Sequence, residues 1–317
     1  METNEVELNK ILNIFFQVCE ISSEHCKKIE NGEIENNVHY KEKNEKFTDI
    51  DWLIQKLIEN IISKYFPYIK IIGEEDTSIN IGIDEKNNNF LSQISKIDIN
   101  KNYFSNEYNY KISLKDKITL FIDPIDATNQ LIKKNFDPVT ILIGICINDK
   151  PKIGIIHYLS ELESHKNITY FNYPEKGVFT FYKNEINKVN INKFNGWKFL
   201  ISYTRSNNDM YEFIKNFENA EYEKIHGCGN KCIKVILNDY CYFSNGNYAV
   251  ALWDICASHC IVQEIGGGFY NFKGEEIKYD YYGREYIKDY IFLISDNKRK
   301  DNFVKNGIEF LKKKSQY

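Results

Sequence analysis

The sequence predicts a layered fold, α+β in its N-terminal part and α/β in its C-terminal part, with helices and sheets alternating as an αβαβα sandwich. Two helical patterns come first, strand-like runs without intervening helices follow them, and strands and helices then alternate to the end of the chain. Strands in succession predict an antiparallel sheet covered by the two helices, and alternation predicts a smaller sheet flanked by helices. A polar stretch at 184–193 separates the two patterns, so we expect subdomains at 1–187 and 188–317.

Apolar spacing predicts the two helices that open the chain. Over residues 5–29 the apolar side chains recur three or four positions apart, which places them on one face of a helix. The next stretch, 32–46, is rich in Lys, Glu and Asn and predicts a mobile loop with solvated charges, or a lid over a phosphate site. A second helix follows, with Thr48 or Asp49 as its N-cap.

β-branched and aromatic runs predict the strands of the first half. A short run at 66–73 ends in an acidic turn, and the weakly periodic stretch 77–116 predicts a surface excursion with one short helix. The remaining strands are expected at 117–122, 139–147, 152–159, 168–171 and 177–182, with a short helix at 128–134 after the first of them.

In the second half of the chain, stretches with the pattern of a strand alternate with stretches whose apolar residues have the period of a helix. Strands are expected at 197–202, 222–225, 240–243 and 290–294, and helices at 206–217, 232–237, 253–265 and 302–313.

Composition excludes several classes of protein. The chain has 317 residues with a net charge of −4, which offers no general attraction to nucleic acid or to an anionic membrane. No apolar stretch approaches the roughly 20 residues that span a bilayer. The eight cysteines are scattered, and the pairs Cys228/Cys232 and Cys256/Cys260 are spaced more widely than the Cys-x-x-Cys of most zinc sites. We therefore expect a cytoplasmic protein with free, buried thiols and no nucleic-acid or membrane partner.

Four acids stand at the ends of predicted elements. Asp123 and Asp126 follow a buried strand on a turn that Pro124 stiffens. Glu74 ends an earlier strand, and Asp254 opens a helix. An Asp-Pro turn and an N-cap aspartate would explain two of these positions without any ligand. Together, however, four carboxylates from three segments would suit Mg²⁺, which prefers oxygen ligands.

Three segments together resemble the signatures of the lithium-sensitive, Mg²⁺-dependent phosphomonoesterase superfamily, which includes inositol monophosphatase. They are Gly-Glu-Glu at 73–75, Asp-Pro-Ile-Asp-Ala-Thr at 123–128, and Trp-Asp at 253–254 followed by Glu-Ile-Gly-Gly at 264–267. Their order and separation match over nearly the whole chain. Within the superfamily the 3′(2′),5′-bisphosphate nucleotidases are the most similar branch, and inositol polyphosphate 1-phosphatase is a near relative. The segments that favour the nucleotidase branch are 66–76, 139–145, 204–206 and 227–231.

The resemblance implies two to three Mg²⁺ ions and inhibition by Li⁺. Glu74, Asp123 and the carbonyl of Ile125 would hold one ion. Asp123, Asp126 and Asp254 would hold a second, and Glu74 would assist a weaker third ion through water.

The resemblance also assigns residues to the reaction and to the substrate. Asp51 and Thr128 would orient and deprotonate the attacking water, although Asp51 in a first helical turn is also favourable electrostatically without any catalytic role. The phosphate would rest on the helix N-terminus that follows Ala127 and Thr128. The positions that match nucleotide contacts in the nucleotidase branch are Thr204, Asn207, Gly227 and Lys231.

At three of these positions, either a second role for the residue is open or the residue differs from the one usual in the motif of the superfamily. Lys231 would bind the phosphate that is retained, or it would be an ordinary exposed lysine on a helix. Position 127 is usually Gly or Ser in this motif, and Ala would cost about 1 kcal/mol if its φ is positive. Because Ser is accepted in relatives, we expect Ala to be tolerated. Position 207 is not always Asn in the proteins that this chain resembles.

The expected reaction is hydrolysis of the 3′-phosphate of adenosine 3′,5′-bisphosphate (PAP) to AMP, with 3′-phosphoadenylyl sulfate (PAPS) as a second substrate. The same metals would serve an inositol polyphosphate 1-phosphatase acting on inositol 1,4-bisphosphate. A non-catalytic sensor of nucleotide or metal is the alternative from another class, but it would not need both Asp51 and Thr128. By resemblance, we expect a monomer.

Overall fold

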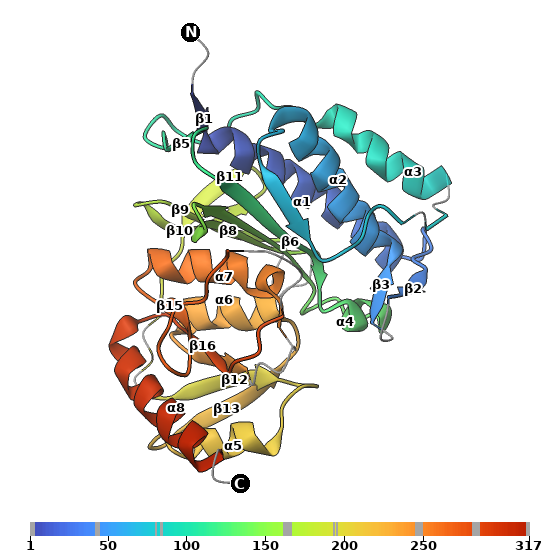
Figure 1. Ribbon diagram of the computed structural model, residues 1–317. Helices are drawn as coiled ribbons and strands as arrows, with labels where there is room; N and C mark the ends of the chain where they lie inside the picture. Colours follow the sequence, from blue (N-terminus) through green and yellow to red (C-terminus); the bar gives the residue numbers. More distant parts are fainter. Residues whose placement is uncertain are drawn as a thin grey trace.

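The computed structural model describes residues 4–41, 45–79, 81–82, 85–160, 167–192, 194, 196–244, 250–280 and 286–314. Helices α1 (Leu8–Glu30) and α2 (Asp49–Tyr65) cover one face of a large sheet, and α6 (Cys228–Asn238) and α7 (Leu252–Glu264) lie between that sheet and a smaller one. Helices α5 (Asn208–Ile214) and α8 (Lys300–Lys314) cover the outer face of the smaller sheet (Figure 1). The predicted αβαβα order of layers is confirmed.

The large sheet has seven strands within the described residues. In spatial order they are β11 (Glu185–Lys188), β10 (Gly177–Tyr182), β9 (Thr169–Tyr173), β8 (Lys150–Tyr158), β7 (Thr140–Ile147), β6 (Ile118–Asp126) and β4 (Lys70–Gly73). All neighbours are antiparallel except β4 and β6, which are parallel, so the prediction of a wholly antiparallel sheet is wrong at this edge. Between β4 and β6 the chain makes a long excursion that includes α3 (Glu85–Ser92), and it then re-enters the sheet in its original direction.

Strand β6 runs further than the sequence predicts. All nine residues are buried, and the strand continues through Pro124 to Asp126 rather than ending at Ile122. The register with β7 shifts between Asp123 and Asp126, because proline has no N–H for the ladder and the chain bulges there. The bulge presents both carboxylates at the end of a rigid central strand.

Short strands are the main elements that the sequence pattern misses. Strands β2 (Val38–Tyr40) and β3 (Lys46–Thr48) pair within the stretch predicted to be a loop. Strands β1 (Glu5–Glu7) and β5 (Lys111–Ser113) pair where a helix start and a surface excursion are predicted. Three residues are too few to display a period of two, so these pairs form where tertiary contacts favour them.

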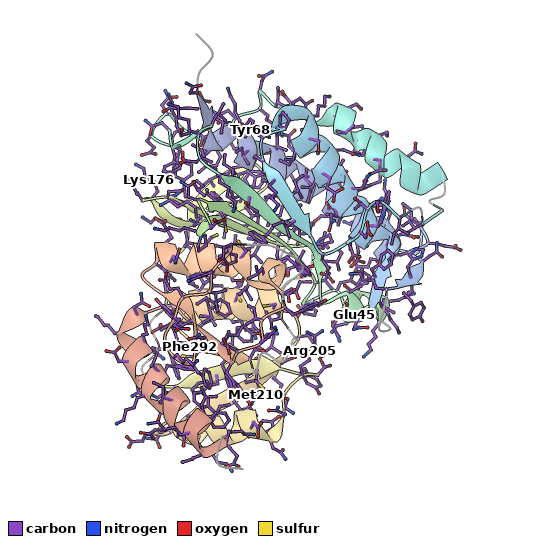
Figure 2. The ribbon with its side chains drawn as sticks, viewed as in Figure 1. Glu45, Tyr68, Lys176, Arg205, Met210 and Phe292 are labelled. Carbon is purple, nitrogen blue, oxygen red and sulfur yellow. The ribbon has the colours of Figure 1, made fainter. Side chains whose placement is uncertain are left out.

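The smaller sheet has five strands in the described part of the chain. Their spatial order is β13 (Glu221–Ile225), β12 (Lys198–Ser202), β14 (Cys241–Ser244), β16 (Ile291–Ile294) and β15 (Gly268–Asn271). Strand β12 is parallel to both of its neighbours, and the other pairs are antiparallel. The sequence pattern misses β15, which has four residues and begins with glycine. Met210 and Phe292 belong to the apolar layer between this sheet and its outer helices (Figure 2).

Two glycines let α7 approach the large sheet closely. Gly144 and Gly154 lie opposite each other in β7 and β8. A Cβ atom on Gly144 would lie 2.4 Å from the Sγ atom of Cys256, and one on Gly154 would lie 2.1 Å from the carbonyl oxygen of Ala257. The backbone of α7 therefore packs directly on the strands, and this fixes the position of Asp254 in its first turn.

All eight cysteines lie in the described part of the chain and are free, as predicted, and all but Cys228 are buried. None of the described helices combines the length and the apolar character that crossing a membrane requires.

Candidate active site

A cavity of about 490 Å³ lies where strand ends and helix starts converge. The C-terminal ends of β6, β12 and β13 reach it, together with the N-termini of α4 (Thr128–Ile132), α6 and α7. Its lining includes Glu45 from the N-terminal half and Arg205 from the C-terminal half, both labelled in Figure 2. Helix N-termini carry partial positive charge and unpaired N–H groups, so this edge of the fold favours an anionic ligand.

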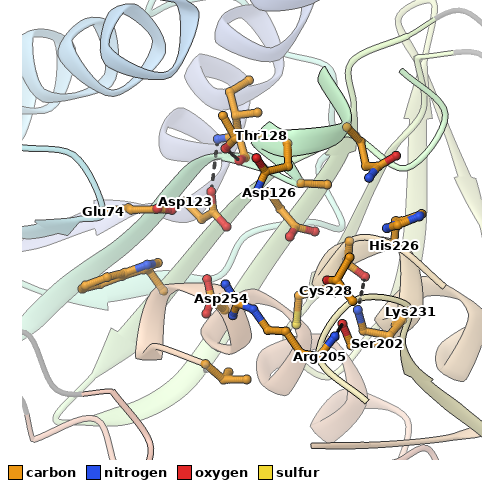
Figure 3. A pocket seen from close by; sticks show the side chains of 18 of the residues that line it. Glu74, Asp123, Asp126, Thr128, Ser202, Arg205, His226, Cys228, Lys231 and Asp254 are labelled. Atoms are coloured by element: carbon orange, nitrogen blue, oxygen red, sulfur yellow. Dashed lines mark hydrogen bonds between the residues drawn. The ribbon is translucent and has the colours of Figure 1, made fainter. Parts of the chain in front are cut away.

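Three of the predicted acids meet at one side of this cavity. Glu74, Asp123 and Asp254 come from three distant segments, and each offers a carboxylate oxygen within 4.8 Å of the others (Figure 3). Burial, followed by the charges of Glu74, Asp126 and Asp254, raises the pKa of Asp123 well above its usual range. Burial and Glu74 raise the pKa of Asp254 to about 7. A divalent cation would remove this repulsion, and an all-carboxylate donor set fits Mg²⁺.

Asp126 and Ile125 line the same cavity but are engaged with protein groups. Asp126 Oδ2 accepts hydrogen bonds from the backbone N–H of Gly229 at 2.7 Å and from Thr140 Oγ1 at 3.2 Å. The carbonyl of Ile125 accepts one from Thr128 Oγ1 at 2.9 Å. Among the described residues, the close cluster of oxygens does not include Asp126. Its predicted role with a second ion therefore stays a prediction.

Asp51 links helix α2 to the start of α4. One carboxylate oxygen, Oδ2, accepts hydrogen bonds from the N–H and the hydroxyl of Thr48, which caps α2 as predicted. The other, Oδ1, lies 3.0 Å from Thr128 Oγ1. Burial is the main cause that raises the pKa of Asp51 to about 7, and Glu74 adds to it. Asp51 therefore serves both the helix cap and the orientation of the Thr128 hydroxyl at the cavity wall.

Lys41 is a site residue that the sequence did not reveal. Its Nζ atom lies 3.1 Å from Glu74 Oε1 and 2.6 Å from Glu75 Oε1. Gln55 positions the acidic turn by exchanging hydrogen bonds of 2.6 and 2.8 Å with the backbone of Glu75. Burial opposes the charge on Lys41, but the two glutamates outweigh it and raise its pKa. Because Lys41 lies in a stretch predicted to be a loop with solvated charges, the sequence alone could not place it against these acids.

Ala127 adopts a left-handed backbone conformation, which glycine tolerates better than a residue with a Cβ atom. It precedes α4 with φ 72° and ψ 37°, in the left-handed region. A Cβ atom in this region approaches the following carbonyl oxygen, which glycine avoids. The condition under which Ala was expected to cost about 1 kcal/mol, a positive φ at position 127, is therefore met.

Replacing Ala127 with glycine is expected to stabilise the protein by about 0.5–1 kcal/mol, because strain relief outweighs the added freedom of the unfolded chain. The free energy of unfolding can be measured in urea. Ala127→Ser keeps the Cβ atom and serves as the matched control without a gain. Equal stability of the glycine and serine variants would contradict the explanation by strain.

The other side of the cavity carries positive charge. Lys231, Gly227 and Thr204 all line it, and Figure 3 shows Lys231 on the side away from Glu74. Lys231 is only 4% exposed, and its Nζ donates to the carbonyl of Gly227 at 2.7 Å, so the alternative of an exposed helix lysine is wrong. Gly227 has φ 78°, and a Cβ atom there would lie 2.6 Å from the carbonyl oxygen of Pro138.

Asn207 is placed elsewhere. Its side chain caps α5 by accepting a hydrogen bond from the N–H of Met210 at 3.2 Å. It is absent from the described residues that line the cavity. Arg205, two positions earlier, lines the cavity instead and points toward Asp254 (Figure 3). Lys133 also lines it, beyond the end of α4. Arg205 lies inside the segment 204–206 that carries the resemblance, which was the one signal that could have singled it out.

Comparisons of sequence agree with this arrangement. The model of the inositol monophosphatase family matches residues 7–304. The 3′(2′),5′-bisphosphate nucleotidase 1 of Rattus norvegicus is 25% identical over 241 residues, which cover 74% of this chain and 73% of the relative. Inositol monophosphatase 3 of Xenopus tropicalis is 24% identical over 287 residues, covering 86% of this chain and 74% of the relative. These two identities are too similar to separate a nucleotide from an inositol substrate.

A comparison of structures gives the same fold. A crystal structure of an IMPase/NADP phosphatase complexed with Mg²⁺ and phosphate superposes with a TM-score of 0.59. It is 16% identical in sequence, and the match covers 92% of this chain and 94% of the other.

Proposed function

Because the chain belongs to the inositol monophosphatase family and is a phosphatase, we propose that it hydrolyses the 3′-phosphate of adenosine 3′,5′-bisphosphate to give AMP and phosphate. PAPS is a second substrate. The cofactor is Mg²⁺, in two to three ions, and Li⁺ inhibits the reaction. One observation carries the proposal. Three convergent carboxylates occupy one side of the cavity and cationic side chains occupy the other, which suits a substrate with two phosphates.

Glu74, Asp123 and Asp254 would hold the metal, with Asp126 and the Ile125 carbonyl completing the donors. When bound, the metal supplies positive charge that stabilises the oxygens of the phosphate under attack. Thr128 orients the attacking water on the cavity wall. Its hydroxyl takes a proton from the water while passing its own to Asp51 Oδ1 at 3.0 Å, and a pKa of about 7 suits Asp51 to that role.

The second phosphate, which the reaction leaves in place, binds on the opposite side. Lys231 and Lys133 supply positive charge there, with Thr204 as a hydroxyl donor. Helix α6 begins at Cys228, after its N-cap Gly227, and its N-terminal end adds the partial positive charge of the helix dipole.

Phosphate release in the presence of Mg²⁺ tests the proposal, with adenosine 3′,5′-bisphosphate, inositol 1,4-bisphosphate and inositol 1-phosphate compared with and without Li⁺. We expect the nucleotide to react fastest and Li⁺ to suppress it, and chelation of the metal provides the blank. Faster release from inositol 1,4-bisphosphate would assign the chain to the inositol polyphosphate branch, for which the same metal donors serve. Tight binding without release from any substrate would support a sensor, although the Asp51–Thr128 contact has no purpose in one.

A further inference from the structure

Tyr203 and His226 form a stacked aromatic pair beside the cavity. They directly follow β12 and β13, whose last residues Ser202 and Ile225 are paired in register. The N–H of Tyr203 donates to the carbonyl of Ile225 at 3.2 Å, which fixes the two strand ends together. The ring centroids lie 4.6 Å apart with an interplanar angle of 28°.

His226 is the member of the pair that lines the cavity, and Tyr203 stacks on it without being among the described residues of the lining. Tyr203 is 58% exposed, which is unusual for a large aromatic side chain beside a ligand cavity. His226, Ser202 and Thr204 all line the cavity, so the residues before and after Tyr203 and its stacking partner all face the ligand space. In Figure 3 His226 lies on the same side as Lys231, away from the acid cluster.

The surroundings of His226 favour the uncharged form of its imidazole. Burial, and then the charges of Lys231 and Lys133, lower its pKa below the ordinary value. The pair thus offers an apolar π surface next to side chains that bind phosphate. An inositol ring is saturated and has no π face to place on it, whereas a nucleobase has one.

We propose that Tyr203 and His226 form a stacking platform for the heteroaromatic base of the substrate. The proposal rests on the phosphatase function proposed above and names the residues that would recognise the base of its nucleotide substrate. A stacking contact involves the π face of a base and not the polar groups on its edge. The platform should therefore favour a nucleotide over a bisphosphate without a base, but it should distinguish only weakly between one purine and another.

The test compares adenosine 3′,5′-bisphosphate with its base-free analogue, tetrahydrofuran 3,5-bisphosphate. The ratio of kcat/KM for the two substrates is measured in the wild type and in Tyr203→Ala. Loss of one stacking surface is expected to lower the ratio about 10-fold, through KM of the nucleotide and not through kcat. Tyr203→Phe should restore the ratio because it keeps the ring. Tyr222→Ala is the matched control and should not change the ratio. Tyr222 is 52% exposed on β13, but its ring contacts Tyr211, which does not line the cavity, whereas Tyr203 stacks on His226, which does.

A ratio that stays unchanged in Tyr203→Ala while phosphate release continues would overturn the platform and leave the phosphatase intact. Absence of release from every substrate in the wild type would instead refute the proposed function. Calorimetric binding of AMP and of ribose 5-phosphate then tests the platform by itself. We expect AMP to bind about 10-fold more tightly and Tyr203→Ala to abolish that difference, and equal affinities in the wild type would overturn the platform.

Discussion

Replacing Asp123 with asparagine is expected to reduce phosphate release by at least about 10³-fold while making the metal-free protein more stable. Asp123 is 2% exposed, and the charges of Glu74, Asp126 and Asp254 surround it. Removing its charge relieves repulsion within the cluster, and it also removes a donor that the metal needs. Activity and metal-free stability should therefore change in opposite directions.

Thermal unfolding with EDTA and with Mg²⁺ measures both effects. The wild type should gain stability when Mg²⁺ is added, because the ion binds only the folded chain, and Asp123→Asn should gain little. Asp116→Asn provides the control, since Asp116 lies outside the cavity and accepts a hydrogen bond from Asn148, which asparagine can still accept. Wild-type rates of release from Asp123→Asn would refute the mechanism.

Replacing Thr128 with alanine should lower kcat by roughly 10²–10⁴-fold, the range for loss of a positioned acid–base group. Thr128→Ser retains the hydroxyl 3.0 Å from Asp51 and should keep most of the activity. Asp51→Asn should lower kcat to a similar extent. Since the two side chains act as one unit, the double variant should be no slower than the slower single variant.

The Mg²⁺-induced shift in melting temperature provides the check on the metal site in these variants. It should persist in Thr128→Ala, because the Thr128 side chain lies outside the acid cluster. Multiplicative loss of activity in the double variant would show that Asp51 and Thr128 act separately.

Long periodic elements could be predicted from the sequence, and short or irregular ones could not. Helices α1 and α2 display their apolar period over many residues, and strands β7 and β8 are long, mostly continuous runs of buried residues. The parallel pairing of β4 depends on the path of the chain through the excursion that follows it, which no local pattern encodes.

Some residues of the candidate site could be predicted from the sequence, and others could not. Glu74, Asp123 and Asp254 each stand at the end of an element, so their chemistry could be predicted, although only the fold shows that they meet. Lys41 could not be predicted, because its role depends on a contact 33 residues further along the chain. Asn207 matched a position in a motif, but the geometry of α5 uses its side chain as a cap.

The close seat of α7 on Gly144 and Gly154 has a consequence for how the molecule moves. Ala257 and Ile261 of this helix belong to one continuous core with residues of both sheets, such as Ile156 and Leu293. A helix packed between two sheets in this way resists relative motion of the two halves, so we expect the mouth of the cavity to keep a nearly constant width. Adjustment to the ligand would then fall to side chains that line the cavity, such as Arg205.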